Sequence, residues 1–258
     1  MNPGKVNIII PVFNQEQYIQ QCLSSALAQT YRHFDVTLIN DGSTDHTMQI
    51  VNEMIDRWNV EVRPKIANPT DGKWIFEGKL NIISRENRGL SESRNEGIRA
   101  GDGEFILPLD SDDWIEPNYL EKTIPKMMED THIGIVSTDM QYEGLLHNRI
   151  PPMGLSLAHE MQSNDLPVCS LIRRTAWEQT PGYETIFVEV AGSTKILGYE
   201  DWCMWLSILK RGWKVGVINE PLFHYRVKPV SMITQATTKH KGLVRMVHLL
   251  HPDLWPNG

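Results

Sequence analysis

The sequence contains few features of a secreted or membrane-embedded protein. Its 258 residues include only three cysteines, Cys22, Cys169 and Cys203, which form neither a zinc-ligand spacing nor a disulfide framework. The apolar run from Val6 to Val12 is too short and too early for a signal peptide, and no stretch approaches the length of a membrane span. We therefore expect a cytoplasmic protein without a transmembrane segment, one that could still contact a membrane peripherally.

The sequence also lacks a net positive charge, internal repeats and a dinucleotide-binding motif. The net charge of −7 argues against a general nucleic-acid-binding surface, so no nucleic-acid partner is expected. No Gly-x-Gly-x-x-Gly follows the first apolar run, which disfavours a dinucleotide oxidoreductase. A hydrophobic content of 41% and a charged content of 22% are typical of globular proteins. The length suits one large α/β domain, or one domain with an appended piece.

Apolar runs alternate with helical periodicity in the first half of the chain. The pattern predicts four strands, at 6–12, 34–40, 80–84 and 104–109, and four helices, at 15–29, 45–57, 91–100 and 117–129. Such alternation is typical of an α/β fold with a Rossmann-like, mostly parallel sheet and helices on both faces.

The remaining segments are less regular. We expect a surface insertion or hairpin at 63–79 and two irregular stretches, at 144–167 and 182–198, of a kind that is usually functional or mobile. Further strands are expected at 133–142 and 213–218, and further helices at 200–210 and 239–250. We expect a single domain over 1–230, with a nucleotide-binding half at 1–115 and an acceptor-binding half at 116–230, followed by a helical tail at 231–258.

The most informative feature is a turn of carboxylates after an apolar run. Asp110, Asp112 and Asp113 directly follow a predicted buried strand, and ligands of open α/β sheets bind at the carboxyl ends of strands. Crowded carboxylates repel one another unless a cation joins them. Their hard oxygens suit Mg²⁺ or Mn²⁺, which commonly bridge to phosphates. The turn predicts a metal–diphosphate site; the alternative is an acidic turn that caps the following helix.

Three more polar clusters follow predicted strands, at 11–14, 41–45 and 85–91. In a parallel sheet these clusters and the carboxylate turn would converge on one edge. A nucleotide needs amide groups for its base, a carboxylate for its ribose and a cation for its phosphates, and the clusters supply each. Asp45 is better explained as the cap of the second helix. Arg94, in the third helix, either faces the phosphates or pairs with Glu86 or Glu92 at the surface.

Six segments, in order along the chain, resemble the motifs of family 2 glycosyltransferases, which have the GT-A fold. They read IIIPVFN at 8–14, NDGSTD at 40–45, ENRGLSESRN at 86–95, LDSDDW at 109–114, GYEDW at 198–202 and FHYRV at 223–227. Each motif alone is weak, but six in the family's order are specific. The resemblance implies an inverting, metal-dependent enzyme of polysaccharide biosynthesis. Such an enzyme moves a sugar from a nucleotide-sugar donor, here expected to be a UDP-sugar, to a hydroxyl of a glycan or lipid-linked acceptor.

The resemblance also implies roles for individual residues. The nucleotide-sugar would be bound by Pro11, Val12, Asn14, Glu16, Asp41, Asn87, Gly89, Leu90, Ser91, Arg94, Asp110 and Ser111. Mn²⁺ or Mg²⁺ would be held by Asp112 and Asp110, and by His224, since some relatives add a late histidine. Arg226 and Lys228 could reach the diphosphate.

The Glu-Asp pair at 200–201 supplies the chemistry that this resemblance requires. Inverting transfer needs a carboxylate that takes the proton of the acceptor hydroxyl. The resemblance assigns this role to Asp201, with Glu200 orienting the acceptor. The alternative is a pair that only stabilises a helix N-terminus. Two other classes compete with a transferase. A sugar-nucleotide pyrophosphorylase usually carries a glycine-rich loop with a lysine where this chain reads PVFN, and a non-catalytic nucleotide-sugar or glycan-binding protein would not need these intact motifs.

Overall fold

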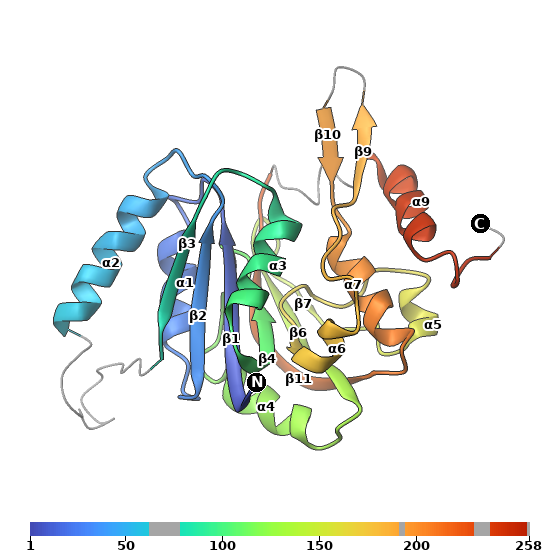
Figure 1. The fold of residues 1–258 in the computed structure, drawn as a ribbon, viewed down its shortest axis with the longest axis horizontal. Helices are drawn as coiled ribbons and strands as arrows, with labels where there is room; N and C mark the ends of the chain where they lie inside the picture. The colour runs from blue at the N-terminus through green and yellow to red at the C-terminus, as the bar shows by residue number, and fades with distance from the viewer. Residues whose placement is uncertain (62–77, 191–193, 230–237, 257–258) are drawn as a thin grey trace.

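A computed structural model describes residues 1–61, 78–190, 194–229 and 238–256 of the chain (Figure 1). Its centre is a nine-stranded mixed sheet in the order β3-β2-β1-β4-β8-β6-β11-β5, with β7 paired to β6. The strands of this sheet are β1 Asn2–Val12, β2 Phe34–Asn40, β3 Leu80–Ser84, β4 Gly103–Pro108, β5 Trp114–Ile115, β6 Ile133–Gly144, β7 Arg149–Ile150, β8 Leu171–Arg173 and β11 Lys214–Val227.

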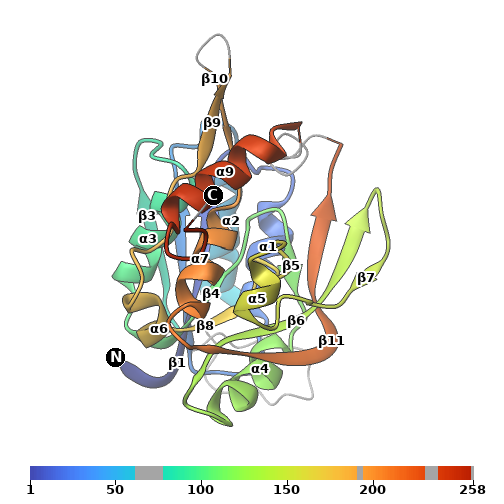
Figure 2. The same cartoon turned by 90° about the vertical axis from the view of Figure 1, so that its right-hand side faces the viewer.

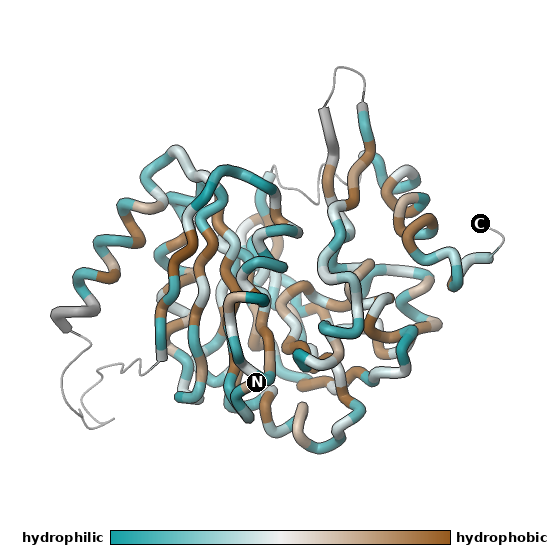
Figure 3. Tube along the Cα trace, viewed as in Figure 1, coloured by the Kyte–Doolittle hydropathy of each residue, from teal (hydrophilic) through white to brown (hydrophobic). Residues whose placement is uncertain are grey.

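Strands β1 to β4 form one parallel part of the sheet, and β6 and β11 form a second parallel pair. β1 pairs in parallel with β2 on one side and with β4 on the other, and β3 extends the sheet beyond β2. The central residues of β1, β2 and β4 are buried, and most of them are hydrophobic, whereas β3 at the edge of the sheet is only partly buried (Figure 3). The predicted strands at 34–40 and 80–84 are confirmed residue for residue, and β1 and β4 include most of their predicted ranges.

Helices cover both faces of this parallel part (Figures 1 and 2). The helices are α1 Ile19–Leu27, α2 Thr47–Glu61, α3 Leu90–Ala100, α4 Tyr119–Met128, α5 Leu157–Glu160, α6 Arg174–Glu178, α7 Glu200–Leu209 and α9 His240–Leu250. Successive side chains of a strand point to opposite faces, so Ile8 and Ile10 join the core under α1 and α4 while Ile9 joins the core under α3, α6 and α7.

Helix α3 approaches the sheet closely because it carries Gly97 at the contact. A Cβ atom at Gly97 would lie 2.5 Å from Ile39 Cδ1 and 2.6 Å from Ile9 Cγ2, closer than side chains pack. The missing side chain therefore sets the distance between α3 and strands β1 and β2. Since α3 begins at the pocket described below, this distance also positions one wall of that pocket.

Two predicted segments differ from the structure. The stretch 182–198, predicted to be irregular, contains an antiparallel hairpin of β9 Phe187–Val190 and β10 Thr194–Leu197. The strand predicted at 213–218 continues to Val227, because it pairs with β6 in parallel and with β5 in antiparallel orientation. His224 therefore lies within β11 and not after it. The stretch 144–167 is irregular apart from β7 and α5, and most of the predicted insertion at 63–79 lies outside the described residues.

The predicted helix at 239–250 is confirmed as α9, which packs beside β9 and α7 (Figures 1 and 2). Its buried Leu243 and Val247 join Ile186, Trp202 and Leu206 in a separate hydrophobic core. This core holds the C-terminal helix against the helix that begins with Glu200. Within the described ranges, no helix is both long and apolar enough to span a lipid bilayer.

Candidate functional site

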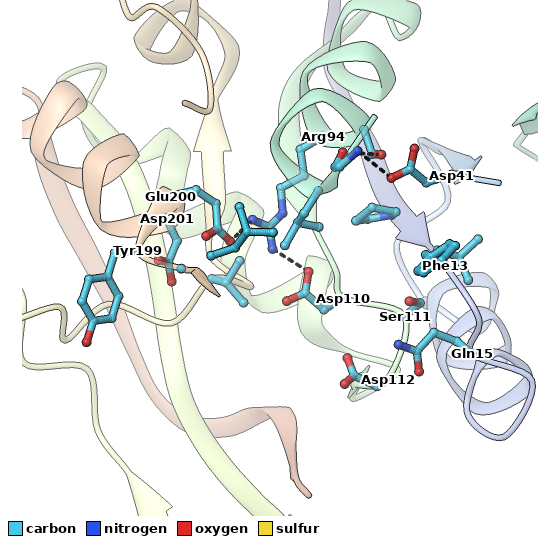
Figure 4. A pocket seen from close by; sticks show the side chains of 18 of the residues that line it. Phe13, Gln15, Asp41, Arg94, Asp110, Ser111, Asp112, Tyr199, Glu200 and Asp201 are labelled. Carbon is cyan, nitrogen blue, oxygen red and sulfur yellow. Dashed lines mark hydrogen bonds and ion pairs between the residues drawn. The ribbon is translucent and has the colours of Figure 1, made fainter. Parts of the chain in front are cut away.

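A pocket of about 530 Å³ lies at the carboxyl ends of β1, β2 and β4 and extends to the start of α7 (Figure 4). The pattern of strand ends predicted this convergence. The predicted residues that line the pocket are Pro11, Val12, Asp41, Asn87, Gly89, Leu90, Arg94, Asp110, Ser111, Asp112, Glu200 and Asp201. The carboxylates predicted to bind the donor and the acidic pair predicted to act in catalysis therefore line the same cavity.

Asn14 and Glu16 belong to the loop after β1 but are not among the residues that line the pocket. Asn14 adopts a positive φ of 51°, and its Oδ1 accepts a hydrogen bond from the backbone N–H of Thr44 at 2.8 Å. A carboxylate oxygen of Glu16 accepts one from the backbone N–H of His46 at 2.9 Å. Both side chains thus join the loop after β1 to the loop after β2. Asp45 accepts a hydrogen bond from the N–H of Thr47 at 3.0 Å, which supports its predicted role as a helix cap.

Asp41 is buried and holds the turn that precedes α3. Its carboxylate accepts hydrogen bonds from the backbone N–H groups of Arg88 at 2.8 Å and Gly89 at 2.9 Å. It also forms an ion pair with Arg85, which in turn pairs with Glu96. Gly89 has a φ of 91°, which favours glycine at this turn. Arg85 opens the polar cluster at 85–91, but nothing in the sequence indicates that it pairs with Asp41.

Arg94 joins the two ends of the pocket. Its side chain is only 1% exposed, and it donates to Asp110 at 2.6 Å and to Glu200 at 2.7 Å (Figure 4). Its guanidinium carbon also lies 5.2 Å from the centre of the Tyr183 ring. Arg94 therefore pairs with Asp110 and Glu200, and not with Glu86 or Glu92 at the surface. Glu92 pairs with Arg99 instead. The ion pairs with two carboxylates raise the pKa of Arg94, although burial alone would lower it.

The three carboxylates of the turn after β4 have different surroundings. Asp110 and Asp112 line the pocket, whereas Asp113 is 1% exposed and accepts a hydrogen bond from the backbone N–H of Arg226 at 2.7 Å. Burial, together with the neighbouring Asp112 and Asp110, raises the pKa of Asp113 well above its usual range. Asp113 is therefore buried beside the backbone of Arg226 and is not among the residues that line the pocket.

The donor set at Asp110 and Asp112 fits a divalent ion that is shared with phosphates. Mg²⁺ typically binds through one or two carboxylates and completes its shell with phosphate oxygens and water. In the part of the chain that the structure describes, no three His, Cys, Asp or Glu side chains gather into a complete protein site. A pair of carboxylates that line the pocket therefore suits a metal–nucleotide complex better than a permanently bound ion.

Glu200 and Asp201 begin α7 and have separate partners. Glu200 points to Arg94, while a carboxylate oxygen of Asp201 accepts hydrogen bonds from the backbone N–H of Trp202 at 2.8 Å and from the side-chain amide of Asn164 at 3.2 Å. Burial and the charge of Glu200 raise the pKa of Asp201 to about 7. The N-cap residue is Tyr199, and its side chain makes no capping hydrogen bond. Asp201 itself accepts a hydrogen bond from a backbone N–H of the first turn, so the alternative of a pair that stabilises the start of α7 stays open.

His224 and Ser91 lie outside the residues that line the pocket. The ring of His224 stacks on Trp114 at 4.9 Å, and its two nitrogens contact Glu116 at 2.7 Å and Glu143 at 3.2 Å. The hydroxyl of Ser91 donates to the carbonyl oxygen of Glu184 at 3.1 Å. The roles predicted for His224 in metal binding and for Ser91 in nucleotide binding stay predictions, with these contacts as the alternative explanation.

Tyr199 and Asn164 also line the pocket and were missed in the sequence analysis. Tyr199 has a φ of 67°, unusual for a residue with a side chain, and its hydroxyl lies 2.7 Å from a ring nitrogen of His240 in α9. Strained conformations of this kind cluster at functional sites. Tyr199 belongs to the GYEDW motif at 198–202, but the motif does not show that its side chain faces the pocket, and the position of Asn164 depends on how the irregular stretch 144–167 folds back.

Comparisons with known proteins identify relatives of this chain. A sequence model described as Glycosyl transferase family 2 matches residues 7–174. Glycosyltransferase GlyA from Streptococcus pneumoniae serotype 4 is 32% identical over 149 residues, which cover 57% of this chain and 19% of GlyA. The chain therefore corresponds to only part of that relative.

Two solved structures share the fold over nearly the whole chain. S. aureus TarS in complex with UDP-GlcNAc aligns with a TM-score of 0.69 at 18% identity, covering 96% of this chain and 66% of the TarS chain. The mannosyltransferase PcManGT from Pyrobaculum calidifontis, in complex with GDP-Man and Mn²⁺, aligns with a TM-score of 0.58 at 17% identity, covering 95% and 69%. These likenesses confirm the predicted α/β, GT-A-like fold.

Proposed function

We propose, because this chain belongs to glycosyl transferase family 2, that it is a nucleotide-sugar-dependent glycosyltransferase of the inverting type. The donor is a UDP-sugar, and the acceptor is a hydroxyl of a glycan or of a lipid-linked sugar. The observation that carries this proposal is the single pocket lined by Asp110, Asp112 and Asp201. Residues 1–115 supply most of the donor side of this pocket, and residues 116–230 supply the acceptor side.

The donor nucleotide lies across the ends of β1, β2 and β4. Pro11, Val12 and Asp41 face its base, and the turn of Asn87 and Gly89 flanks its ribose and diphosphate. The backbone N–H groups of that turn already donate to Asp41, so the carboxylate keeps the turn in shape for the nucleotide. Asp110 is held by Arg94 beside the place where the ribose or the sugar would lie.

Asp112 and Asp110 would hold the divalent ion, Mn²⁺ or Mg²⁺, when the donor diphosphate is bound. When bound, the ion acts as a Lewis acid that stabilises the negative charge of the leaving diphosphate. Asp113 keeps the turn in place from behind through its hydrogen bond with the backbone of Arg226. His224 has carboxylate partners of its own and is a weaker candidate for the metal shell.

Asp201 takes the proton of the acceptor hydroxyl as that hydroxyl attacks the anomeric carbon. A carboxylate with a pKa of about 7 is a more effective base near neutral pH than an ordinary aspartate, because it binds the proton more strongly. Asn164 donates to one oxygen of Asp201 and thereby orients the carboxylate. Glu200 is engaged by Arg94, which leaves the role of base to Asp201.

A panel of nucleotide sugars tests this function without an acceptor. The protein is incubated with each donor and Mn²⁺, and slow hydrolysis of the donor is followed by release of free nucleotide. We expect hydrolysis of one or a few UDP-sugars, with loss of activity in EDTA and in Asp112→Asn. Binding of nucleotide sugars without any turnover, with or without glycan acceptors, would instead identify a non-catalytic binding protein.

A further inference from the structure

Lys228 supplies a cation to the carboxylate that is expected to bind metal. Its Nζ lies 2.5 Å from Asp112 Oδ2, and the two side chains are 18% and 23% exposed. Both residues line the pocket. The Nζ also lies 5.0 Å from the centre of the Tyr18 ring, which adds a cation–π contact. The repulsion expected among the crowded carboxylates is thus relieved within the protein, by Arg94 at Asp110 and by Lys228 at Asp112.

Arg226, two residues before Lys228, attaches the end of β11 to the carboxylate turn. The Arg226 side chain donates to the backbone carbonyl of Asp112 at 2.9 Å and to Gln21 at 2.6 Å. Its guanidinium carbon lies 4.7 Å from the ring centres of both Tyr18 and Trp114, so the group is sandwiched between two aromatic faces. The end of β11 is therefore fastened to the carboxylate turn, and the contact between Lys228 and Asp112 is part of this construction.

We propose that Lys228 is the resident counter-ion of Asp112, which competes with the divalent ion for this carboxylate and moves to the donor diphosphate when metal and nucleotide bind. This inference rests on the proposed function. An ammonium group and a divalent ion at the same carboxylate weaken each other's binding, because their positive charges repel at this short range. The lysine stem is long and flexible, so the displaced ammonium can reach a phosphate oxygen nearby.

This exchange of partners makes metal and nucleotide bind cooperatively. The metal alone must displace Lys228 without offering it a new partner. With the nucleotide present, the diphosphate receives the ammonium, and the cost of breaking the ion pair with Asp112 is offset. The same ammonium gives the metal-free protein some affinity for a nucleoside diphosphate.

Removal of the charge at Lys228 tests the competition directly. Mn²⁺ binding without nucleotide is measured by electron paramagnetic resonance for the unmodified protein, Lys228→Met, Lys228→Arg and the control Lys122→Met. Lys122 forms an exposed ion pair with Glu220, away from the pocket. We expect Lys228→Met to bind Mn²⁺ about fivefold more tightly, the scale of a partly exposed ion pair. Lys228→Arg and the control should remain near the unmodified protein.

The second readout is calorimetry of UDP and uridine in EDTA. We expect Lys228→Met to bind UDP about fivefold more weakly, with no change for uridine, which lacks the diphosphate. Unchanged Mn²⁺ affinity in a Lys228→Met protein that melts normally would overturn the proposal, as would equal losses for UDP and uridine. Lys228→Gln replaces Lys228→Met if the latter unfolds. Failure of the proposed glycosyltransferase function is recognised separately, by the lack of donor turnover in the unmodified protein.

Discussion

At the scale of single residues, Arg94 shows how the site depends on contacts that no local pattern reveals. Its position in the motif from Glu86 to Asn95 predicted proximity to the nucleotide, and it does line the pocket. Its ion pair with Glu200 joins side chains 106 residues apart, and such a pair follows only from the completed fold. The carboxylate turn was predictable because its three residues lie together in the sequence. The partner of each carboxylate was not.

The clearest prediction for one residue concerns Asp201. In Asp201→Asn, transfer should fall by roughly 10²-fold or more, the scale expected when a positioned general base is lost, while UDP affinity stays nearly constant. The raised pKa of Asp201 means that its charged form costs stability, and this cost grows as the pH rises from 3.8, the ordinary pKa of an aspartate, toward about 7. The variant should therefore melt at the same or a higher temperature at pH 8. A helix-capping role predicts near-normal turnover instead. Measuring rate, UDP affinity and melting temperature on one preparation separates the two.

The pH dependence of turnover provides an independent test. A base must be deprotonated to act, so kcat/KM should fall tenfold for each pH unit below the pKa of Asp201, which burial and Glu200 raise to about 7. The profile is measured at saturating Mn²⁺, with metal binding checked at each pH. An acidic limb near pH 4 would show that the base has an ordinary carboxyl pKa and would remove the effect assigned to burial.

At the scale of elements, the predictions succeeded where one pattern covers a whole strand and failed where strands are short or interrupted. β2 and β3 were predicted residue for residue, because each is a short, uninterrupted segment with apolar residues at its centre. The hairpin of β9 and β10 was missed because its two strands have only four residues each. β11 was predicted too short because Pro221 interrupts its pattern. The structure accommodates Pro221 at a register shift between β11 and β6, where a ladder hydrogen bond is not required.

The contact of α3 with the sheet leads to a prediction for Gly97. Alanine normally stabilises a helix interior relative to glycine by about 1 kcal/mol. In Gly97→Ala, the new methyl group would collide with Ile9 and Ile39, so we expect a net loss of stability of about 1–3 kcal/mol. Urea unfolding measures this loss. Arg99→Ala, an exposed change in the same helix, should stay within about 0.5 kcal/mol. A Gly97→Ala protein more stable than the original would show that α3 can move away from the sheet at little cost.

At the scale of the whole molecule, the division into a nucleotide half, an acceptor half and a tail does not correspond to separate cores. β5, from the first half, pairs with β11 from the second, and α9 shares a core with α7. The convergence of strand ends on one pocket could be predicted, because parallel strands place their carboxyl ends on the same edge. The side of the pocket that contains Glu200 and Asp201 could be predicted only through family resemblance. The chain before α7 is not a regular strand–helix unit, so no pattern places the start of α7 at the strand ends.

The shared core of α7 and α9 predicts that the tail unfolds together with the rest of the protein. Leu243→Ala removes a fully buried side chain and should cost about 2–5 kcal/mol. Leu249→Ala changes a residue of the same helix that is 61% exposed, and it should cost less than about 0.5 kcal/mol. Denaturant unfolding followed by tryptophan fluorescence and by circular dichroism should give one coincident transition for each protein. Equal, small effects of the two changes would mean that α9 is only loosely attached.

The place of β4 in the sheet has a consequence for synthesis of the chain on the ribosome. β4 pairs with β1 on one side. At its other edge, Phe105 and Ile106 pair with β8, Leu171–Arg173, which is synthesised later. Translation at ~5–20 residues per second leaves this edge open for several seconds, on the order of 3–13 s. An apolar strand with unpaired N–H and C=O groups is a template for aggregation. The nascent chain is therefore most vulnerable between the emergence of β4 and that of β8, and slower translation of this interval would lengthen its exposure.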